Sequence, residues 1–363
     1  MVTYLLYMAM PAIVWVLFMP FTKYSVDEND SHKKKYLFVC GALMFFMLAC
    51  RHYTVGSGDG AWYYNNWLLM SNSSFESLKI IVGDMDVESG YLIISWILSR
   101  VFKDPQFVFV FYGLLVSVSV CRFVYKNSEH VMMSLTMFNC LGLWGFMVQG
   151  IRQGIAMCIC LFAVEYCKKK KFVPFLLVVL LATLFHASAI VFVAVYFFSS
   201  LHMNIRDYFI TGALVVVGML LMDYLWQYVN YFINDSYEIG ITDDSSGGIV
   251  STIIYILILA LAMLFHKNEY DTDGNYMSVF FYMTLIGFIA FVMRYSYNTI
   301  AQRVSYYFLF GQMAVLPTIT RRYLVEKQRG IINLVIILLC YGIAIYKASY
   351  TLLIPYNFFW QVV

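Results

Sequence analysis

Four arginines stand at or near the ends of otherwise apolar stretches: Arg51, Arg152, Arg294 and Arg303. A guanidinium keeps its charge at any physiological pH, and it is costly to place near hydrocarbon. Such residues commonly face a cavity and bind an anion, and the plainer alternative is an interfacial arginine that snorkels to water. Four of them on one face favour the anion site.

The first arginine opens the segment Arg51 to Asp59, where Gly56, Gly58 and Gly60 allow backbone to approach a ligand. Asp59 could serve as a general base, accept hydrogen bonds from sugar hydroxyls or orient an arginine, or it could belong to a plain capping loop. The rings that follow could stack on sugars or form an interfacial belt: Trp62, Tyr63, Tyr64 and Trp67.

The second arginine lies between two glycines, Gly150 and Gly154, where a helix is expected to begin. Arg152 can offer a two-pronged donor to a phosphate, and Gln153 can hydrogen-bond a hydroxyl. The free N–H groups of a helix start also favour anions. Small-residue helix packing would explain the glycines without any ligand.

His186 lies midway through a long apolar stretch, where an outer turn is expected. A histidine there is either a satisfied structural residue or a group for proton transfer, for which its pKa range is suited. A further predicted outer turn separates Arg294 from Arg303, with tyrosines such as Tyr306 around them. Cations beside tyrosines suit a diphosphate next to a carbohydrate.

The sequence lacks the motifs of several other classes of enzyme. No P-loop, G-x-S-x-G elbow or metal-ligand spacing occurs, so neither a metal nor a cofactor is expected. The eight cysteines lie in or beside apolar runs without a CxxC pair, which favours packing roles. An enzyme with this sequence would take a donor that is already activated and membrane-bound.

Composition places these residues in a bilayer. The chain has 363 residues, of which 62% are apolar and 12% charged, whereas soluble domains carry about 25% charge. Spans of roughly 20 apolar residues predict an all-α polytopic membrane protein of about 12 transmembrane helices, forming one integral membrane domain over residues 1–363.

Loop charges orient this domain. The basic clusters at 33–35, 168–171 and 321–329 should be cytoplasmic, and the acidic loops 53–88 and 232–248 extracytoplasmic. Consistency between them requires that 89–103 be a re-entrant or interfacial helix, and that 172–200 form two short helices meeting near His186. The arginines then share the outer face.

The assembled motifs resemble the EpsG family of Wzy-like polysaccharide polymerases. "RHYTVGSGD" (51–59), "IRQGIAMCICLF" (151–162) and "LATLFHASAIV" (181–191) are similar to family signatures, as are "QRVSYYFLF" (302–310) and "IPYNFFW" (354–360). The ordered set covers nearly the whole chain. The first motif is one residue longer than the family pattern before Asp59.

The resemblance implies a GT-C-like architecture and a metal-independent glycosyltransferase of the bacterial cytoplasmic (inner) membrane, with its site facing the periplasm. Its substrate would be an oligosaccharide on undecaprenyl diphosphate, polymerised into O-antigen, capsule or exopolysaccharide. A chain-length regulator is a candidate partner, and nucleic acid is not. His186 or Asp59 would be the base, and the substrate and diphosphate ligands would be Arg51, Arg152, Gln153, Arg294, Arg303 and Tyr306.

Two alternatives share parts of this pattern. A transporter or flippase for lipid-linked sugars would line a path across the whole membrane, with Asp223 and Glu165 as the residues to watch. An O-antigen ligase-type transferase would use the same leaving group and differ in its acceptor.

Overall fold

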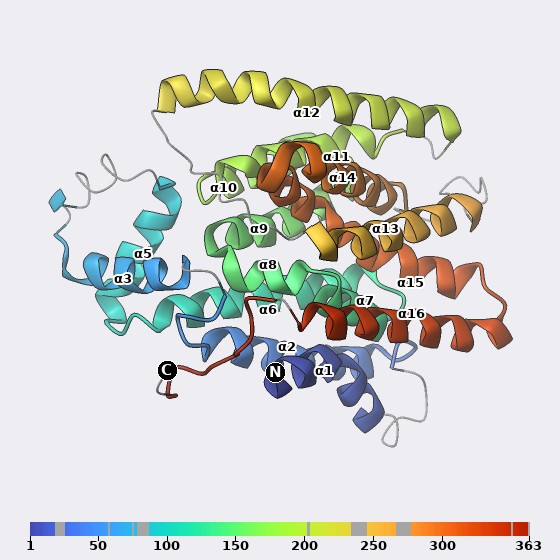
Figure 1. The fold of residues 1–363 in the computed structure, drawn as a ribbon, viewed down its shortest axis with the longest axis horizontal. Coiled ribbons are helices and arrows are strands. Elements are labelled where there is room, and N and C mark those ends of the chain that lie inside the picture. The colour runs from blue at the N-terminus through green and yellow to red at the C-terminus, as the bar shows by residue number, and fades with distance from the viewer. Residues whose placement is uncertain are drawn as a thin grey trace.

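The computed structural model shows an all-helical protein in the residues that it describes (Figure 1). Described are residues 1–18, 26–56, 59–74, 76–77, 87–201, 204–233, 245–265, 277–349 and 351–361, without the side chains of 219, 222–233, 245–249, 251, 265 and 295–300. Within these ranges the only extended pairing is an isolated bridge between Arg51 and Phe358.

The helices follow one another in this order: α1 (Val2–Phe18), α2 (Asp30–Ala49), α3 (Asp59–Asn72), α5 (Ser89–Val101), α6 (Phe107–Asn127), α7 (Val131–Cys140), α8 (Leu143–Gln149), α9 (Ile151–Lys168), α10 (Phe172–Thr183), η2 (Ala187–Phe192), α11 (Val193–Phe198), α12 (Ile205–Ile233), α13 (Ser245–Phe265), α14 (Met277–Phe308), η3 (Leu309–Gly311), α15 (Gln312–Arg322) and α16 (Glu326–Lys347).

Few of these helices are long straight spans. Among the described residues, three are long and apolar enough to cross a bilayer, within α6, α14 and α16, and a bent pair, α7 with α8, makes up to four. Further apolar helices, such as α5 and α10, run for only 10 to 17 residues, so the predicted count of about 12 spans is not confirmed. The chain is a helical membrane-type protein whose apolar runs are often broken.

The turn predicted near His186 is confirmed. Helix α10 ends at Thr183 and η2 begins at Ala187, with His186 extended between them. The two arms run antiparallel, because Phe175 packs on Phe192 (ring centroids 6.2 Å apart) and Phe172 on Tyr196 (5.0 Å). A single straight helix through this stretch is therefore excluded.

The two predicted acidic loops differ in how much of each the structure describes. The segment 53–88, predicted as a loop, contains helix α3, which packs against α5, the short helix observed where 89–103 was predicted as re-entrant or interfacial. Most of the predicted loop 232–248 lies outside the described residues, as does the side chain of Asp223.

Helix α14 folds back on itself between Gly287 and Phe308. A straight helix would separate these residues by roughly 30 Å. A Cβ placed on Gly287 would nevertheless lie 3.1 Å from the Phe308 Cβ and 3.2 Å from the Leu309 nitrogen. The chain therefore reverses within α14, as the turn predicted between Arg294 and Arg303 requires.

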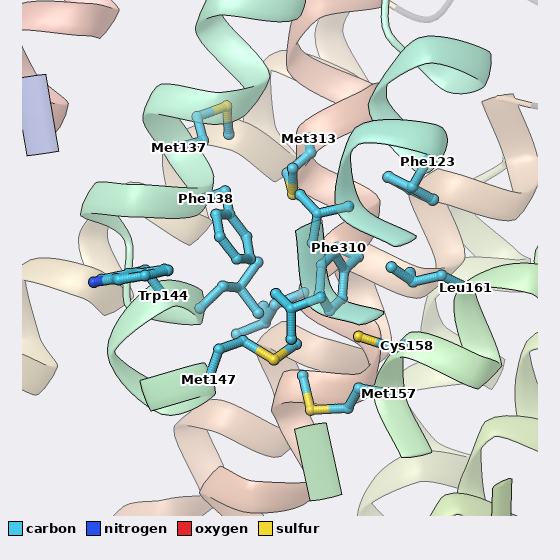
Figure 2. Packing of buried hydrophobic residues seen from close by; sticks show 14 of the residues in the cluster. Phe123, Met137, Phe138, Trp144, Met147, Met157, Cys158, Leu161, Phe310 and Met313 are labelled. Atoms are coloured by element: carbon cyan, nitrogen blue, oxygen red, sulfur yellow. The ribbon is translucent and has the colours of Figure 1, made fainter. Parts of the chain in front are cut away.

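The core where these helices meet is rich in aromatic and sulfur-containing side chains (Figure 2). Phe138 contacts both Trp144 (6.4 Å between ring centroids) and Phe310 (6.2 Å), and all three are buried. Helices in lipid associate by close packing rather than by removing apolar surface from water, and methionine fills irregular gaps well. This core fixes the ends of α8 and α9, where the site lies.

Two breaks in the helices bear on that packing. Gly142, with φ +109°, separates α7 from α8, which meet at 55°. Pro11 lies inside α1, where it cannot supply a backbone donor. Both breaks place backbone carbonyls inside the bundle.

Candidate functional site

The junction of α8 and α9 is the centre of the candidate site. Gly150 ends α8 and begins α9 within one residue, and a Cβ there would lie 2.8 Å from the Phe146 ring. A Cβ at Gly154, one turn later, would overlap the hydroxyl of Tyr112. The two glycines thus serve close packing, which leaves Arg152 between them at the start of an 18-residue helix.

Glu88 holds the central position in the site. Its carboxylate accepts a hydrogen bond from Arg152 Nη1 at 2.5 Å with one oxygen. The other oxygen lies 2.6 Å from His186 Nδ1 and accepts the Ala187 N–H at 3.3 Å. Three distant parts of the chain, the start of α5, the start of α9 and the α10–η2 turn, meet at this carboxylate.

The surroundings of Glu88 keep it ionised. Burial acts to raise the pKa of this carboxyl, but the hydrogen bond to His186 and the charge of Arg152 outweigh burial and lower the pKa to about 2. The side chain is 18% exposed, as is that of Arg152, and His186 is 14% exposed. The group is therefore a partly buried cluster in which the Glu88 carboxylate, ionised at neutral pH, lies between the Arg152 cation and the His186 imidazole.

Gly90 fixes the approach of α5 to the His186 turn. The Gly90 N–H donates to the Leu184 carbonyl at 2.9 Å, and a Cβ at Gly90 would overlap that same oxygen. Only glycine permits this backbone contact, which sets Glu88 two residues away against His186.

Helix α3 covers Arg152 from a further side. The Arg152 N–H donates to the Tyr63 hydroxyl at 3.4 Å, and the guanidinium lies 5.6 Å from the centre of the Trp62 ring. Asp59, predicted as one of two candidate bases, is exposed at the start of this helix, one turn before Tyr63, and does not join the Glu88 cluster.

The reversal of α14 closes the other side of the junction. Gln153 donates to the Arg303 carbonyl at 2.7 Å, and Tyr306 stacks on Phe146 at 4.3 Å between ring centroids. The Arg303 side chain is exposed next to this contact. Arg294, on the first arm of the reversal, covers the Phe291 ring at 4.3 Å and is half-buried.

Arg51 differs from the other three arginines. It is 1% exposed, donates to the Val148 carbonyl and covers the Phe109 ring at 4.5 Å. Its Nε and Nη2 have no hydrogen-bond partner among the described residues. The C-terminal segment crosses over it, with the Phe359 N–H donating to the Cys50 carbonyl at 2.9 Å. Arg51 thus lies behind the junction and holds the last turn of α8.

The structure brings together most of the residues that the sequence singled out. Arg152, Gln153, His186, Tyr306 and the Arg303 backbone all adjoin the α8–α9 junction, in the contacts described above. The central residue, Glu88, was counted in the sequence only as one of several acidic loop residues. Its signal was its position directly before the apolar stretch 89–103, at the cap of the helix that follows.

Comparison with known proteins adds one finding. A family model described as the EpsG family matches residues 34–358, which contain every element of the junction. No curated protein and no solved structure shows a significant match.

Proposed function

The chain belongs to the EpsG family, and from that premise we propose that it is a membrane-embedded polymerase of undecaprenyl-diphosphate-linked oligosaccharide repeat units. The product is a bacterial surface polysaccharide. The apolar helices support a membrane location, and the loop charges support a site that faces outward from the cytoplasmic membrane. The contact of Glu88 with His186 and Arg152 is the observation that carries the proposal.

His186 is the general base of the proposed reaction. Glu88 occupies Nδ1 of the ring, so Nε2 is the nitrogen that can face an acceptor hydroxyl. The hydroxyl oxygen bonds to the anomeric carbon of the donor while its proton passes to Nε2, and the bond from that carbon to the diphosphate oxygen breaks. The Glu88 carboxylate stabilises the imidazolium that results.

Arginines receive the leaving group. The departing lipid diphosphate gains negative charge as its bond to the sugar breaks, and cations already in place stabilise it. Arg152 combines a two-pronged donor with the free N–H groups at the start of α9. Arg303, exposed beside Gln153, is the second proposed ligand, and Arg294 adds charge on the same turn. The proposal assigns to arginine the role that a metal ion has in other transferases.

Geometry supports His186 over Asp59 as the base. A base must be held at a defined orientation to the hydroxyl that it deprotonates. His186 has a carboxylate partner at 2.6 Å, whereas Asp59 is exposed at the rim on α3. Asp59 is better suited to receive hydrogen bonds from sugar hydroxyls.

The test uses Arg152→Ala in protein purified into lipid nanodiscs and supplied with the lipid-linked repeat unit. We expect the rate of linkage to fall by about a hundredfold or more, because one of the preorganised donors to the developing charge is lost. The readouts are the polymer ladder and the release of undecaprenyl diphosphate.

Arg206→Ala is the matched control, since Arg206 is an exposed arginine in the first turn of α12, away from the junction. It should keep the wild-type ladder. Wild-type chain lengths in Arg152→Ala would refute the assignment. Transfer of the repeat unit to a separate acceptor by the wild type, with no polymer ladder, would instead indicate a ligase.

A further inference from the structure

Three rings at the outer end of the molecule form a continuous stack. His52 lies 4.3 Å from Tyr53, and Tyr53 lies 4.8 Å from Tyr64, measured between ring centroids. All three side chains are half-buried, so each ring has an exposed part. We name His52, Tyr53 and Tyr64 the aromatic platform.

Two glycines build the platform. Gly56 has φ +94°, a conformation that other residues rarely adopt, and it turns the chain after the first two rings. Gly60, in the first turn of α3, lies so close to the Tyr53 carbonyl that a Cβ would overlap it. The second contact presses Tyr53 against α3, where Tyr64 meets it. The stack is therefore set by backbone packing.

Hydrogen-bonding groups surround the rings. Thr54, which bonds His52 Nδ1 at 2.8 Å, is exposed, and so are Asp59 and Asp104. The Tyr64 hydroxyl is a donor at neutral pH, as for any tyrosine, and burial, followed by the charges of Asp104 and Tyr53, raises its pKa further. These groups around the platform, which we call its rim, are carboxylates and hydroxyls.

Cations are directed away from this rim. Arg100 and Lys103, the basic residues of the neighbouring segment, donate to the Met70 and Ser71 carbonyls at the opposite end of α3. An anionic ligand would find two carboxylates and no described cation paired with the rings. The platform therefore does not suit a diphosphate.

Neutral or hydroxyl-rich carbohydrate suits it better. The apolar C–H faces of a sugar ring pack on aromatic faces, while its hydroxyls donate to carboxylates. A lipid headgroup or an interfacial belt would be expected where the apolar side chains are exposed. Those side chains on α3, Leu68 and Leu69, lie toward its other end.

Helix α3 contacts both the platform and the catalytic cluster. Tyr63, whose hydroxyl accepts the Arg152 N–H, lies between Trp62 and Tyr64 on the same helix. The platform and the group that holds Arg152 and His186 are thus linked through one helix. We propose that the aromatic platform is a second, carbohydrate-only subsite, which holds sugars of the growing polymer remote from the lipid diphosphate. This inference rests on the proposed polymerase function.

The test compares wild type with the double variant Tyr53→Ala/Tyr64→Ala in nanodiscs. The probe is a lipid-free oligosaccharide of two to four repeat units, released by mild acid from the lipid-linked pool, and its affinity is measured by saturation-transfer NMR titration. We expect about a tenfold weaker affinity in the double variant, since the contact surface of two rings is lost. The polymer ladder should shorten, while the rate of the first linkage stays near the wild-type value.

Two further variants separate stacking from folding. Tyr64→Phe keeps the ring and should bind the oligosaccharide nearly as the wild type does. Leu68→Ala/Leu69→Ala removes exposed apolar surface from the same helix and should change neither affinity nor ladder. If the double variant does not purify as a folded protein, Tyr64→Leu, which keeps the volume without the ring, replaces it.

The outcomes are distinct. Equal affinity in the wild type and the platform variants, or no binding to either, overturns the inference and leaves the polymerase proposal standing. Failure of the wild type to form polymer refutes the polymerase, and the titration still decides whether the platform binds carbohydrate.

Discussion

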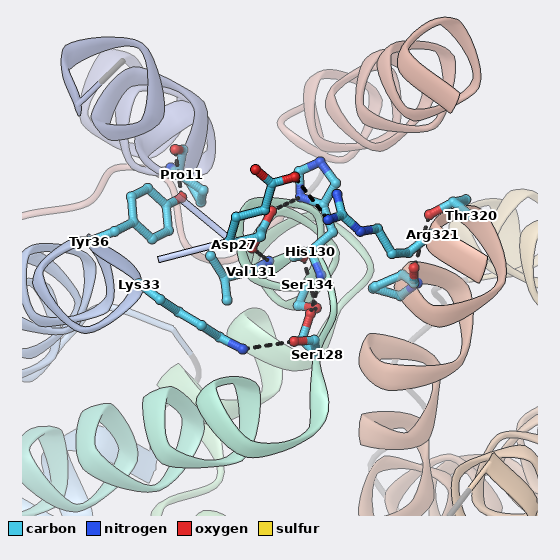
Figure 3. A network of polar contacts seen from close by, with 12 residues as sticks. Pro11, Asp27, Lys33, Tyr36, Ser128, His130, Val131, Ser134, Thr320 and Arg321 are labelled. Atoms are coloured by element: carbon cyan, nitrogen blue, oxygen red, sulfur yellow. Dashed lines mark hydrogen bonds and ion pairs between the residues drawn. The ribbon is translucent and has the colours of Figure 1, made fainter. Parts of the chain in front are cut away.

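Two clusters in this protein use the same chemical groups to different ends. The cluster that the proposed topology places outside, here the outer cluster, consists of Glu88, Arg152 and His186, which join side chain to side chain at 2.5 and 2.6 Å. The inner network, at the opposite end of the bundle, also contains a carboxylate and a histidine, Asp27 and His130, but these lie 3.6 Å apart (Figure 3).

Most of the polar side chains in the inner network form hydrogen bonds with backbone groups. Asp27 accepts the Val131 N–H at 3.0 Å, which caps α7. Lys33 donates to the Ser128 carbonyl at 2.9 Å, and Ser134 donates to the Ser128 hydroxyl at 2.7 Å. These bonds tie the start of α2 and the α6–α7 loop to α7. The network therefore has a structural role, which is to hold these segments together.

Electrostatics separates the two clusters in the same way. Burial raises the pKa of Asp27 and lowers the pKa of His130, and their mutual attraction only partly opposes this. The inner pair is thus pushed toward its neutral forms, whereas Glu88 is held ionised. A carboxylate kept charged beside a histidine is the arrangement that catalysis uses, and a carboxyl that caps a helix needs no such charge.

The largest expected difference is in activity. Glu88→Gln keeps the shape of the side chain but removes the charge that stabilises the His186 imidazolium, and we expect the linkage rate to fall by about 10² to 10⁴. Asp27→Asn should keep a nearly wild-type rate, because an amide oxygen can still accept the Val131 N–H. Polymer ladders from both proteins, normalised to folded protein, measure this. Similar losses of linkage rate in the two variants would contradict the distinction between a catalytic and a structural cluster.

The next effect concerns how Glu88 is placed. Gly90→Ala adds a Cβ against the Leu184 carbonyl, so α5 must shift and Glu88 must move from His186. We expect roughly a tenfold fall in kcat with little change in KM, since a small misplacement of a catalytic group is costly. Gly330→Ala, where a Cβ meets nothing within 4 Å, is the control. A KM effect alone would point to substrate binding instead.

A fall in pH should change the stability contributions of Glu88 and Asp27 in opposite directions. The pKa of Glu88 is lowered from 4.5 to about 2, so its stabilisation is present above pH 4.5 and is lost as pH falls toward 2. The pKa of Asp27 is raised from 3.8, so its contribution is present below that value and is lost as pH rises through the folded-state pKa.

Thermal unfolding of nanodisc samples between pH 7 and pH 3 measures these contributions as differences from matched variants. The excess stability of wild type over Glu88→Gln should shrink as pH falls. The stability of wild type relative to Asp27→Asn should instead rise. Parallel trends in the two comparisons would contradict the assigned charge states.

The smallest effect is expected at the exposed ion pairs beside the inner network. Arg321 pairs with Glu28 at 3.0 Å and Arg322 with Glu129 at 2.5 Å, and both arginines are at least one-third exposed. Arg321→Ala and Arg322→Ala should each cost less than about 1 kcal/mol of stability and leave the polymer ladder unchanged. A large loss of activity in either would show that the inner end also takes part in the reaction.

Much of the outer cluster could be predicted from the sequence, because its residues interrupt apolar runs. A histidine inside hydrocarbon-like sequence and an arginine between two glycines are costly without a purpose, so both stood out. Loop charges then required a chain reversal near His186, and the structure has it. These inferences rest on the free-energy cost of placing a polar side chain in an apolar environment, and the sequence shows directly where this occurs.

Glu88 and Arg51 show where that reasoning ends. A carboxylate in an acidic loop costs nothing in water, so sequence gave no reason to separate Glu88 from its neighbours. Arg51 stood out as a candidate anion ligand, and the sequence did not reveal that it is buried against the Val148 carbonyl. The predicted count of about 12 spans is not confirmed by the described helices, of which three or four are long and apolar enough to cross a bilayer, and apolar content does not reveal where a helix bends.

The broken helices have a consequence for the backbone itself. Pro11 leaves the carbonyl of Tyr7, four residues earlier in α1, without its usual donor, and Asn139 from α7 donates to that oxygen at 3.1 Å. In hydrocarbon an orphaned carbonyl cannot turn to water. A side chain from a neighbouring helix repairs the gap that the proline makes.

Tyrosines carry out the same repair at other breaks. Tyr255 donates to the Leu141 carbonyl at 3.2 Å where α7 stops, and Tyr112 donates to the Met147 carbonyl at 2.8 Å in the last turn of α8. The chain has 30 tyrosines, and the two that make these bonds are buried inside the bundle. Part of that abundance is what allows helices to stop and restart inside a solvent that offers no hydrogen bonds.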